Sequence, residues 1–131
     1  MSIPLRCDDL ILLAEERAGQ RQTHAECLSA AGFAVLELVS TDEAVSALEC
    51  RSDVRLLIVE PYMPGCVSGL ELGRFVSRRW PHVPILVLGW PKEAIPSLPP
   101  SVHLLPDTCS SAVLLEVVLA RLAPTQQPAG G

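Results

Sequence analysis

The stretch that decides the fold is Leu56-Leu57-Ile58-Val59-Glu60-Pro61-Tyr62-Met63-Pro64-Gly65. Its first four residues form an uninterrupted apolar run, which is typical of a parallel strand that is buried on both faces of a sheet. The prolines and the glycine that follow predict a turn. Glu60 therefore stands at the carboxyl end of a buried strand, where open α/β sheets bind their ligands.

The rest of the chain alternates between similar apolar runs and helical patterns. Further strands are predicted at 10–14, 34–39, 85–88 and 102–105. Helices are predicted at 20–31, 44–48, 70–79 and 111–122. Gly32 is a natural helix stop, and Ser40 and Glu43 have the spacing of a capping box. This order predicts a parallel sheet with helices on both faces, joined by right-handed crossovers.

Two of the predicted helices carry an apolar face that we expect to pack on the sheet. The inward residues would be Leu72, Phe75 and Val76 in the third helix, and Leu115, Val118, Leu119 and Leu122 in the last. Between the fourth and fifth strands, four prolines within 90–101 leave room for little more than one helical turn. The fourth crossover should therefore be short or irregular.

Length and charge bound the function. At 131 residues the chain fits one domain, expected over 1–123, followed by a flexible tail at 124–131 without apolar periodicity. The formal net charge is −5. The three cations of one short helix, Arg74, Arg78 and Arg79, make a poor footprint for a phosphate backbone and read as a solvated helix end. We therefore expect no direct nucleic-acid binding.

The cysteines indicate a reducing compartment, and the apolar runs are too short for membrane insertion. The five cysteines are odd in number and show no metal-ligand spacing, so they read as reduced thiols. Residues 1–9 lack the pattern of a signal peptide, and no apolar run approaches the length of a membrane span. The expected location is the cytoplasm, without membrane insertion.

Three motifs together carry a family resemblance. These are Ile11-Leu12-Leu13-Ala14-Glu15-Glu16, the stretch from Leu56 to Gly65, and Gly69-Leu70-Glu71-Leu72. They resemble the motifs of response-regulator receiver domains over nearly the whole chain, with a loop at 65–68 one residue longer than usual. The resemblance implies a flavodoxin-like five-stranded sheet in the order 2-1-3-4-5. It also implies an Mg²⁺ site at Glu15, Glu16 and Glu60, with Glu60 at the phosphate-accepting position.

Three departures from the receiver pattern predict altered switch chemistry. Glu60 replaces the acceptor aspartate, and its longer side chain shifts the carboxylate from in-line alignment. Gly89 stands where the family has a threonine or serine, so it offers no hydroxyl. Asp107 stands where a lysine binds the phosphoryl oxygens, which removes a cation and adds an anion. Phosphoryl transfer depends on positive charge, so this pocket is electrostatically unsuited to it.

The acidic residues leave two interpretations open. If Glu15, Glu16, Glu60 and Asp107 meet, they could retain Mg²⁺ or Ca²⁺, since hard cations prefer oxygen ligands. Alternatively, they form a solvated acidic rim, with Arg17 or Arg21 as local compensation. We favour the rim, because glutamates in these positions disturb octahedral geometry.

Other side chains are weaker candidates for a functional role. Cys66 and Cys109 could be reactive thiols, although we favour the interpretation that they are small residues that fill space. The histidines His24, His82 and His103 are expected at the surface. Trp80 and Trp90 could form an interface, although aromatic caps over a sheet edge are more common.

The functional hypothesis is a degenerate receiver, or pseudo-receiver, that is not an enzyme and binds proteins in bacterial signalling without phosphorylation. Its partner would be a histidine kinase, an output domain or another receiver, and it could form a homodimer. A receiver that still accepts phosphate at Glu60 with metal help is the first alternative. The second is a small flavodoxin-like enzyme or ligand binder, which no glycine-rich loop or nucleophile and base pair supports.

Overall fold

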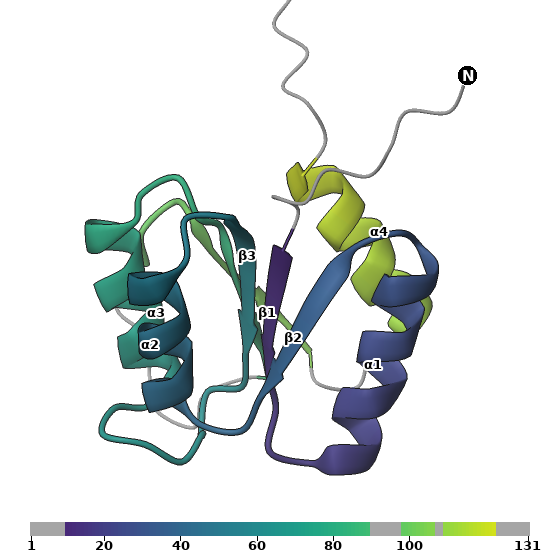
Figure 1. Cartoon of the computed structure of the whole chain (residues 1–131), viewed down its shortest axis with the longest axis horizontal. Helices are drawn as coiled ribbons and strands as arrows, with labels where there is room; N and C mark the ends of the chain where they lie inside the picture. Colours follow the sequence, from purple (N-terminus) through teal and green to yellow (C-terminus); the bar gives the residue numbers. More distant parts are fainter. Residues whose placement is uncertain (1–9, 90–97, 107–108, 123–131) are drawn as a thin grey trace, which may run out of the picture.

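The computed structural model describes residues 10–89, 98–106 and 109–122 of the chain (Figure 1). All five predicted strands are present and pair in parallel, in the order β2-β1-β3-β4-β5. The strands are β1 Leu10–Ala14, β2 Ala34–Leu38, β3 Val54–Val59, β4 Ile85–Leu88 and β5 Val102–Leu105. The helices are α1 Ala18–Ala30, α2 Thr41–Cys50, α3 Gly69–Arg79 and α4 Ser111–Leu122. The predicted flavodoxin-like fold is confirmed.

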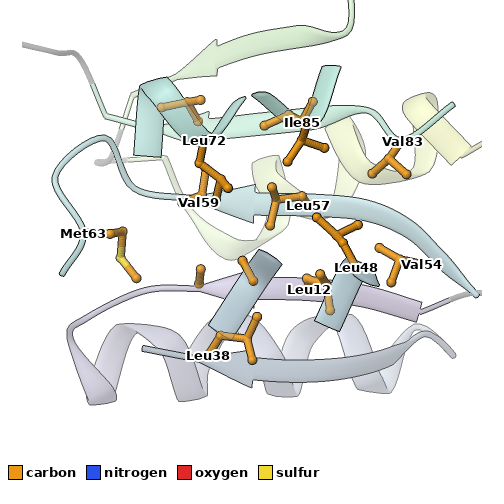
Figure 2. Close-up of a cluster of buried hydrophobic side chains, with 14 of the residues drawn as sticks. Leu12, Leu38, Leu48, Val54, Leu57, Val59, Met63, Leu72, Val83 and Ile85 are labelled. Atoms are coloured by element: carbon orange, nitrogen blue, oxygen red, sulfur yellow. The ribbon is translucent and has the colours of Figure 1, made fainter. Parts of the chain in front are cut away.

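The helices cover the two faces of the sheet in pairs. Helices α2 and α3 lie on one face, and α1 and α4 lie on the other (Figure 1). Strand residues alternate between the two resulting cores, because successive side chains point to opposite faces. In β1, Leu12 packs with the α2 and α3 side, whereas Ile11 and Leu13 pack with the α1 and α4 side. Figure 2 shows the first of these cores, including Leu12, Leu57 and Leu72.

Local signals place the helix ends where the sequence predicts them. Gly32 has a φ of 104°, which glycine adopts without strain, and its N–H bonds to the carbonyl of Ser29 just after α1 ends. At the start of α2, Ser40 Oγ accepts from the N–H of Glu43 at 3.1 Å. The Glu43 carboxylate reaches back to the Val39 N–H at 2.8 Å, one residue before the cap.

Two predicted inward residues are wrong. Leu72 and Val76 face the sheet from α3, but Phe75 is 36% exposed. In α4 the buried pair is Leu114 and Val118, and Leu119 is 48% exposed. In each helix the buried stripe follows two residues four positions apart, which leaves Phe75 and Leu119 on the outer side.

Some expectations concern residues outside the described part of the chain. The predicted tail at 124–131, Asp107 and most of the fourth crossover lie there. Within the described ranges, no helix is both long enough and apolar enough to span a bilayer.

Candidate functional site

The candidate site lies at the carboxyl edge of the central strands, where β1 and β3 are neighbours. Ala14 at the end of β1 pairs with Val59 at the end of β3, so the acidic residues that follow both strands lie at the same edge. Glu60 Oε1 accepts a hydrogen bond from the backbone N–H of Glu16 at 2.8 Å. The Glu60 carboxylate is therefore engaged by the chain itself.

Burial sets the protonation behaviour of Glu60. The pKa of Glu60 is raised chiefly because its half-buried position penalises the charged form. The hydrogen bond from Glu16 and the charge of Arg17 act in the opposite direction, and the nearby charges of Glu15 and Glu16 add to the rise. Glu60 thus holds its proton to a higher pH than an ordinary glutamate.

Glu15 is turned away from the open rim and buried. Alternation along β1 places it on the α1 and α4 side, in line with Ile11 and Leu13. Its side chain has 0% exposure, and Nδ1 of His24 lies 2.6 Å from Oε1 and 3.1 Å from Oε2. His24, which lies on α1, is only 4% exposed, so its expected surface position is wrong. A carboxylate can only accept, so Nδ1 donates this bond.

Arg21 ties the same corner together from α1. Its Nη1 donates to the carbonyl of Glu15 at 2.8 Å, and its Nε donates to Glu37 Oε1 on β2 at 3.1 Å. Its carboxylate partner is therefore Glu37, whereas the charge that acts on Glu60 is that of Arg17. Arg21 also joins the end of β1 to the neighbouring strand β2.

Two of the three carboxylates expected to bind Mg²⁺ are hydrogen-bonded within the protein. Glu15 is committed to His24, Glu60 is committed to the Glu16 amide, and only the Glu16 side chain is exposed. Among residues 10–89, 98–106 and 109–122, no group of three or more His, Cys, Asp or Glu side chains is arranged to hold a metal. The described acids do not form the expected ligand set, and the buried Glu15 does not belong to the alternative solvated rim either. Metal binding stays a prediction.

The end of β4 is shaped by Gly89. Its φ is 124°, a region that residues with a Cβ rarely adopt, and its N–H donates to the carbonyl of Leu105 at 2.6 Å. The position offers neither a hydroxyl nor a backbone suited to threonine. Asp107, the other switch-equivalent residue, lies outside the described residues.

The loop after Glu60 is docked on the start of α2. The hydroxyl of the buried Thr41 donates to the carbonyl of Val67 at 2.9 Å, and the Thr41 N–H donates to Pro64 O at 2.9 Å. Gly65 has a φ of 136°, and a Cβ there would collide with the Thr41 hydroxyl. The loop that is longer than the receiver pattern is thereby held in place. Its glycine was visible in the sequence, but Thr41 was not recognisable as its partner.

The two candidate reactive thiols, Cys66 and Cys109, differ in their exposure. The pKa of the exposed Cys66 thiol is raised by its hydrogen bond with Asp42 and by the charge of that carboxylate. A raised pKa lowers the thiolate fraction and disfavours a nucleophilic role. Cys109 is half-buried.

Comparison with known proteins finds matches among solved structures but not among family models or curated proteins. Among solved structures, the receiver domain of the hybrid histidine kinase CckA is 27% identical, with a TM-score of 0.71, covering 86% of this chain and 98% of that one. The chain has the fold of receiver domains.

Other solved receivers agree with this likeness. A response-regulator receiver protein from Sinorhizobium medicae WSM419 is 22% identical with a TM-score of 0.74, covering 86% of this chain and 93% of that one. The chemotaxis response regulator CheY4 of Vibrio cholerae is 21% identical with a TM-score of 0.71, covering 86% and 98%. At these identities the likeness shows the receiver fold, and the site chemistry rests on this chain's own residues.

The raised pKa of Glu60 predicts a pH dependence of stability. The folded state keeps the Glu60 proton at pH values where the unfolded state, with a glutamate pKa of about 4.3, has released it. Stability should therefore fall as the pH rises from about 4 through the raised pKa. In Glu60→Gln, whose amide oxygen can still accept from Glu16, this fall should shrink.

Urea denaturation at several pH values measures this effect, and Glu116→Gln is the matched control. Glu116 is exposed on α4 and its replacement removes the same formal charge. Equal pH profiles for Glu60→Gln and the wild type would contradict the raised pKa.

Proposed function

We propose that the chain is a degenerate receiver that acts as a phosphorylation-independent protein-interaction module in bacterial two-component signalling. The observation that carries the proposal is the 2.8 Å bond from the Glu16 N–H to Glu60 Oε1. This bond occupies an oxygen at the phosphoacceptor position and ties it to the end of β1. A nucleophile that must attack a phosphorus atom in line needs a free and correctly aimed oxygen.

The surroundings of Glu60 also weigh against phosphoryl transfer. The charges of Glu15 and Glu16 act on it from the neighbouring strand end, so added negative charge would be repelled. Arg17 is the cation that acts on Glu60, and its effect is smaller than that of burial. Gly89 has no hydroxyl to follow a phosphoryl group, and in the sequence Asp107 replaces the cation. Preorganised positive charge, on which phosphoryl transfer depends, is lacking in this set.

The proposed role is binding, in the cytoplasm and without enzymatic activity. The partners we propose are a histidine kinase, an output domain or another receiver, with a homodimer as a further possibility and without direct contact to nucleic acid or membrane. The raised pKa and the backbone bond of Glu60 suggest that the switch is held in one state.

Intact-mass spectrometry after incubation with acetyl phosphate and Mg²⁺ tests the proposal. We expect no mass gain of a phosphoryl group on the wild type, because the Glu60 carboxylate is engaged and its neighbours are acidic. A known phosphorylatable receiver in the same tube shows that the reagent is active.

Glu60→Gln is the control that assigns any adduct. An adduct on the wild type that disappears in Glu60→Gln would overturn the proposal in favour of a working switch at Glu60. Dependence of that adduct on Mg²⁺ would also establish the metal site. No adduct on a folded chain supports the binding module.

A further inference from the structure

Positive charge gathers at the edge of the sheet opposite the candidate site. Residues 49–55 and 74–83 hold five of the ten cationic side chains of the chain and only two carboxylates, a formal charge of +3 in a chain of −5. These stretches form the end of α2, the start of β3 and the second half of α3. They meet because helices on a parallel sheet run opposite to the strands, so helix ends lie beside strand starts. Figure 1 shows α2 and α3 side by side on one face of the sheet.

The second half of α3 carries an arginine–aromatic face, defined here as Arg74, Phe75, Arg78, Arg79 and Trp80. The rings of Phe75 and Trp80 pack edge to face, with centroids 5.9 Å apart. The Arg79 guanidinium lies 4.6 Å from the Trp80 ring and pairs with Glu49 of α2 at 2.8 Å. Arginine and aromatic side chains that are already fixed before binding lose little entropy on contact with a partner.

Two hollows adjoin this face. The first has a volume of about 390 Å³ and an apolar floor that includes Leu48, Val54, Trp80 and Val83. The second, of about 340 Å³, is lined by Arg74, Ser77, Arg78, Leu98 and Pro99. The first hollow thus combines an apolar floor with the polar side chains of Glu49, Arg51 and His82, and the second is a cationic recess beside α3.

Within the described residues, neither cation of the second hollow pairs with a carboxylate. Buried Nη2 of Arg74 has no hydrogen-bond partner in the described part of the chain. Arg78 is exposed and forms no ion pair with any described residue, whereas Arg51 and Arg79 each hold a carboxylate. An unsatisfied buried donor is unfavourable, so a ligand carboxylate placed there would supply the missing hydrogen-bond partner.

We infer that the arginine–aromatic face binds an acidic protein segment that places a carboxylate against Arg74 and Arg78 and an apolar side chain beside Trp80. The net charge of this edge favours an anionic partner, and the apolar floor of the first hollow favours a peptide over a sugar-phosphate backbone. The inference deepens the proposed function and rests on its protein-binding part. It places the contact far from Glu60, so the phosphorylation test is read separately.

Selection of short random peptides on the immobilised full chain tests this inference. We expect enriched peptides to combine Asp or Glu with Leu, Phe or Trp. The affinity of a synthesised winner should fall roughly tenfold or more in Arg78→Glu and in Phe75→Ala, because central arginine and aromatic contacts dominate interfaces. Raising the salt concentration should also weaken binding.

Arg121→Glu is the matched control, since Arg121 is also exposed but lies on α4 across the sheet. Its effect should stay within about twofold, as is usual for a charge outside an interface. Circular dichroism verifies that each variant is folded. Enrichment of neutral or basic peptides, absence of enrichment, an equal loss in Arg121→Glu, or displacement of the peptide by duplex DNA would each overturn the inference.

Discussion

Replacing His24 with leucine is expected to lower the free energy of unfolding by about 3 kcal/mol. The substitution leaves the Glu15 carboxylate with 0% exposure and without the imidazole that lies 2.6 Å away. A buried charge that loses its partner is far more costly than the pair itself, because neither water nor protein then solvates it. Small domains are stable by only about 5–15 kcal/mol, so the loss is a large fraction.

Urea denaturation followed by circular dichroism measures the His24 effect, and His82→Leu is the matched control. His82 is exposed, so its replacement should change stability by no more than about 0.5 kcal/mol. The double variant Glu15→Leu and His24→Leu should recover much of the loss, since it removes both polar groups. Equal stabilities of His24→Leu and His82→Leu would show that the pair contributes nothing.

Replacing Gly69 with alanine is the second change with a large expected effect, at about 3 kcal/mol or more. A Cβ at this position would collide with the carbonyl oxygen of Glu60, and the backbone on both sides is fixed. The Gly69 N–H bonds to Pro61 O at 2.9 Å, and Ser68 with Glu71 forms a capping box at the same helix start. Relief therefore requires movement of Glu60 and weakens its bond to Glu16.

Gly73→Ala on the same helix is the control for this prediction. Its added Cβ would meet Ile85 and Val102 at 3.7 Å, an ordinary contact distance. Alanine is the better helix former by about 1 kcal/mol, so this variant should be as stable as the wild type or more stable. Thermal unfolding of both variants measures the difference, and an equal midpoint for the two would contradict the crowding at Gly69.

Much of the fold was predictable because it depends on local patterns. The apolar runs of β1 and β4 contain no polar residue, which is typical of strands buried on both faces. Gly32 ends α1 by its positive φ, and Ser40 caps α2 through the Glu43 amide. Phe75 and Leu119 were wrongly predicted to face the sheet. The spacing of apolar residues shows that a helix is amphipathic, but it does not fix how the helix is rotated about its axis against the sheet.

The candidate site was predictable in position but only partly in arrangement. Glu60 and Glu16 lie together as expected, because parallel strand ends share one edge. Glu15 was placed on the rim, yet alternation with Ile11 and Leu13 already indicated the opposite, inner direction. No motif in the sequence identifies His24 as its partner, since Glu15 follows β1 and His24 lies nine positions later on α1.

The sequence by itself determined the strands, the helices, their order and the departures at Glu60 and Gly89. These depend on residue types and on periodicities of two or of about 3.6, which the chain carries locally. Only the tertiary structure decided that Glu60 bonds to the Glu16 amide, that Glu15 pairs with His24, and that Arg79 pairs with Glu49 of α2. Each of these joins residues from different elements, and only packing of those elements on the sheet sets the distances between them.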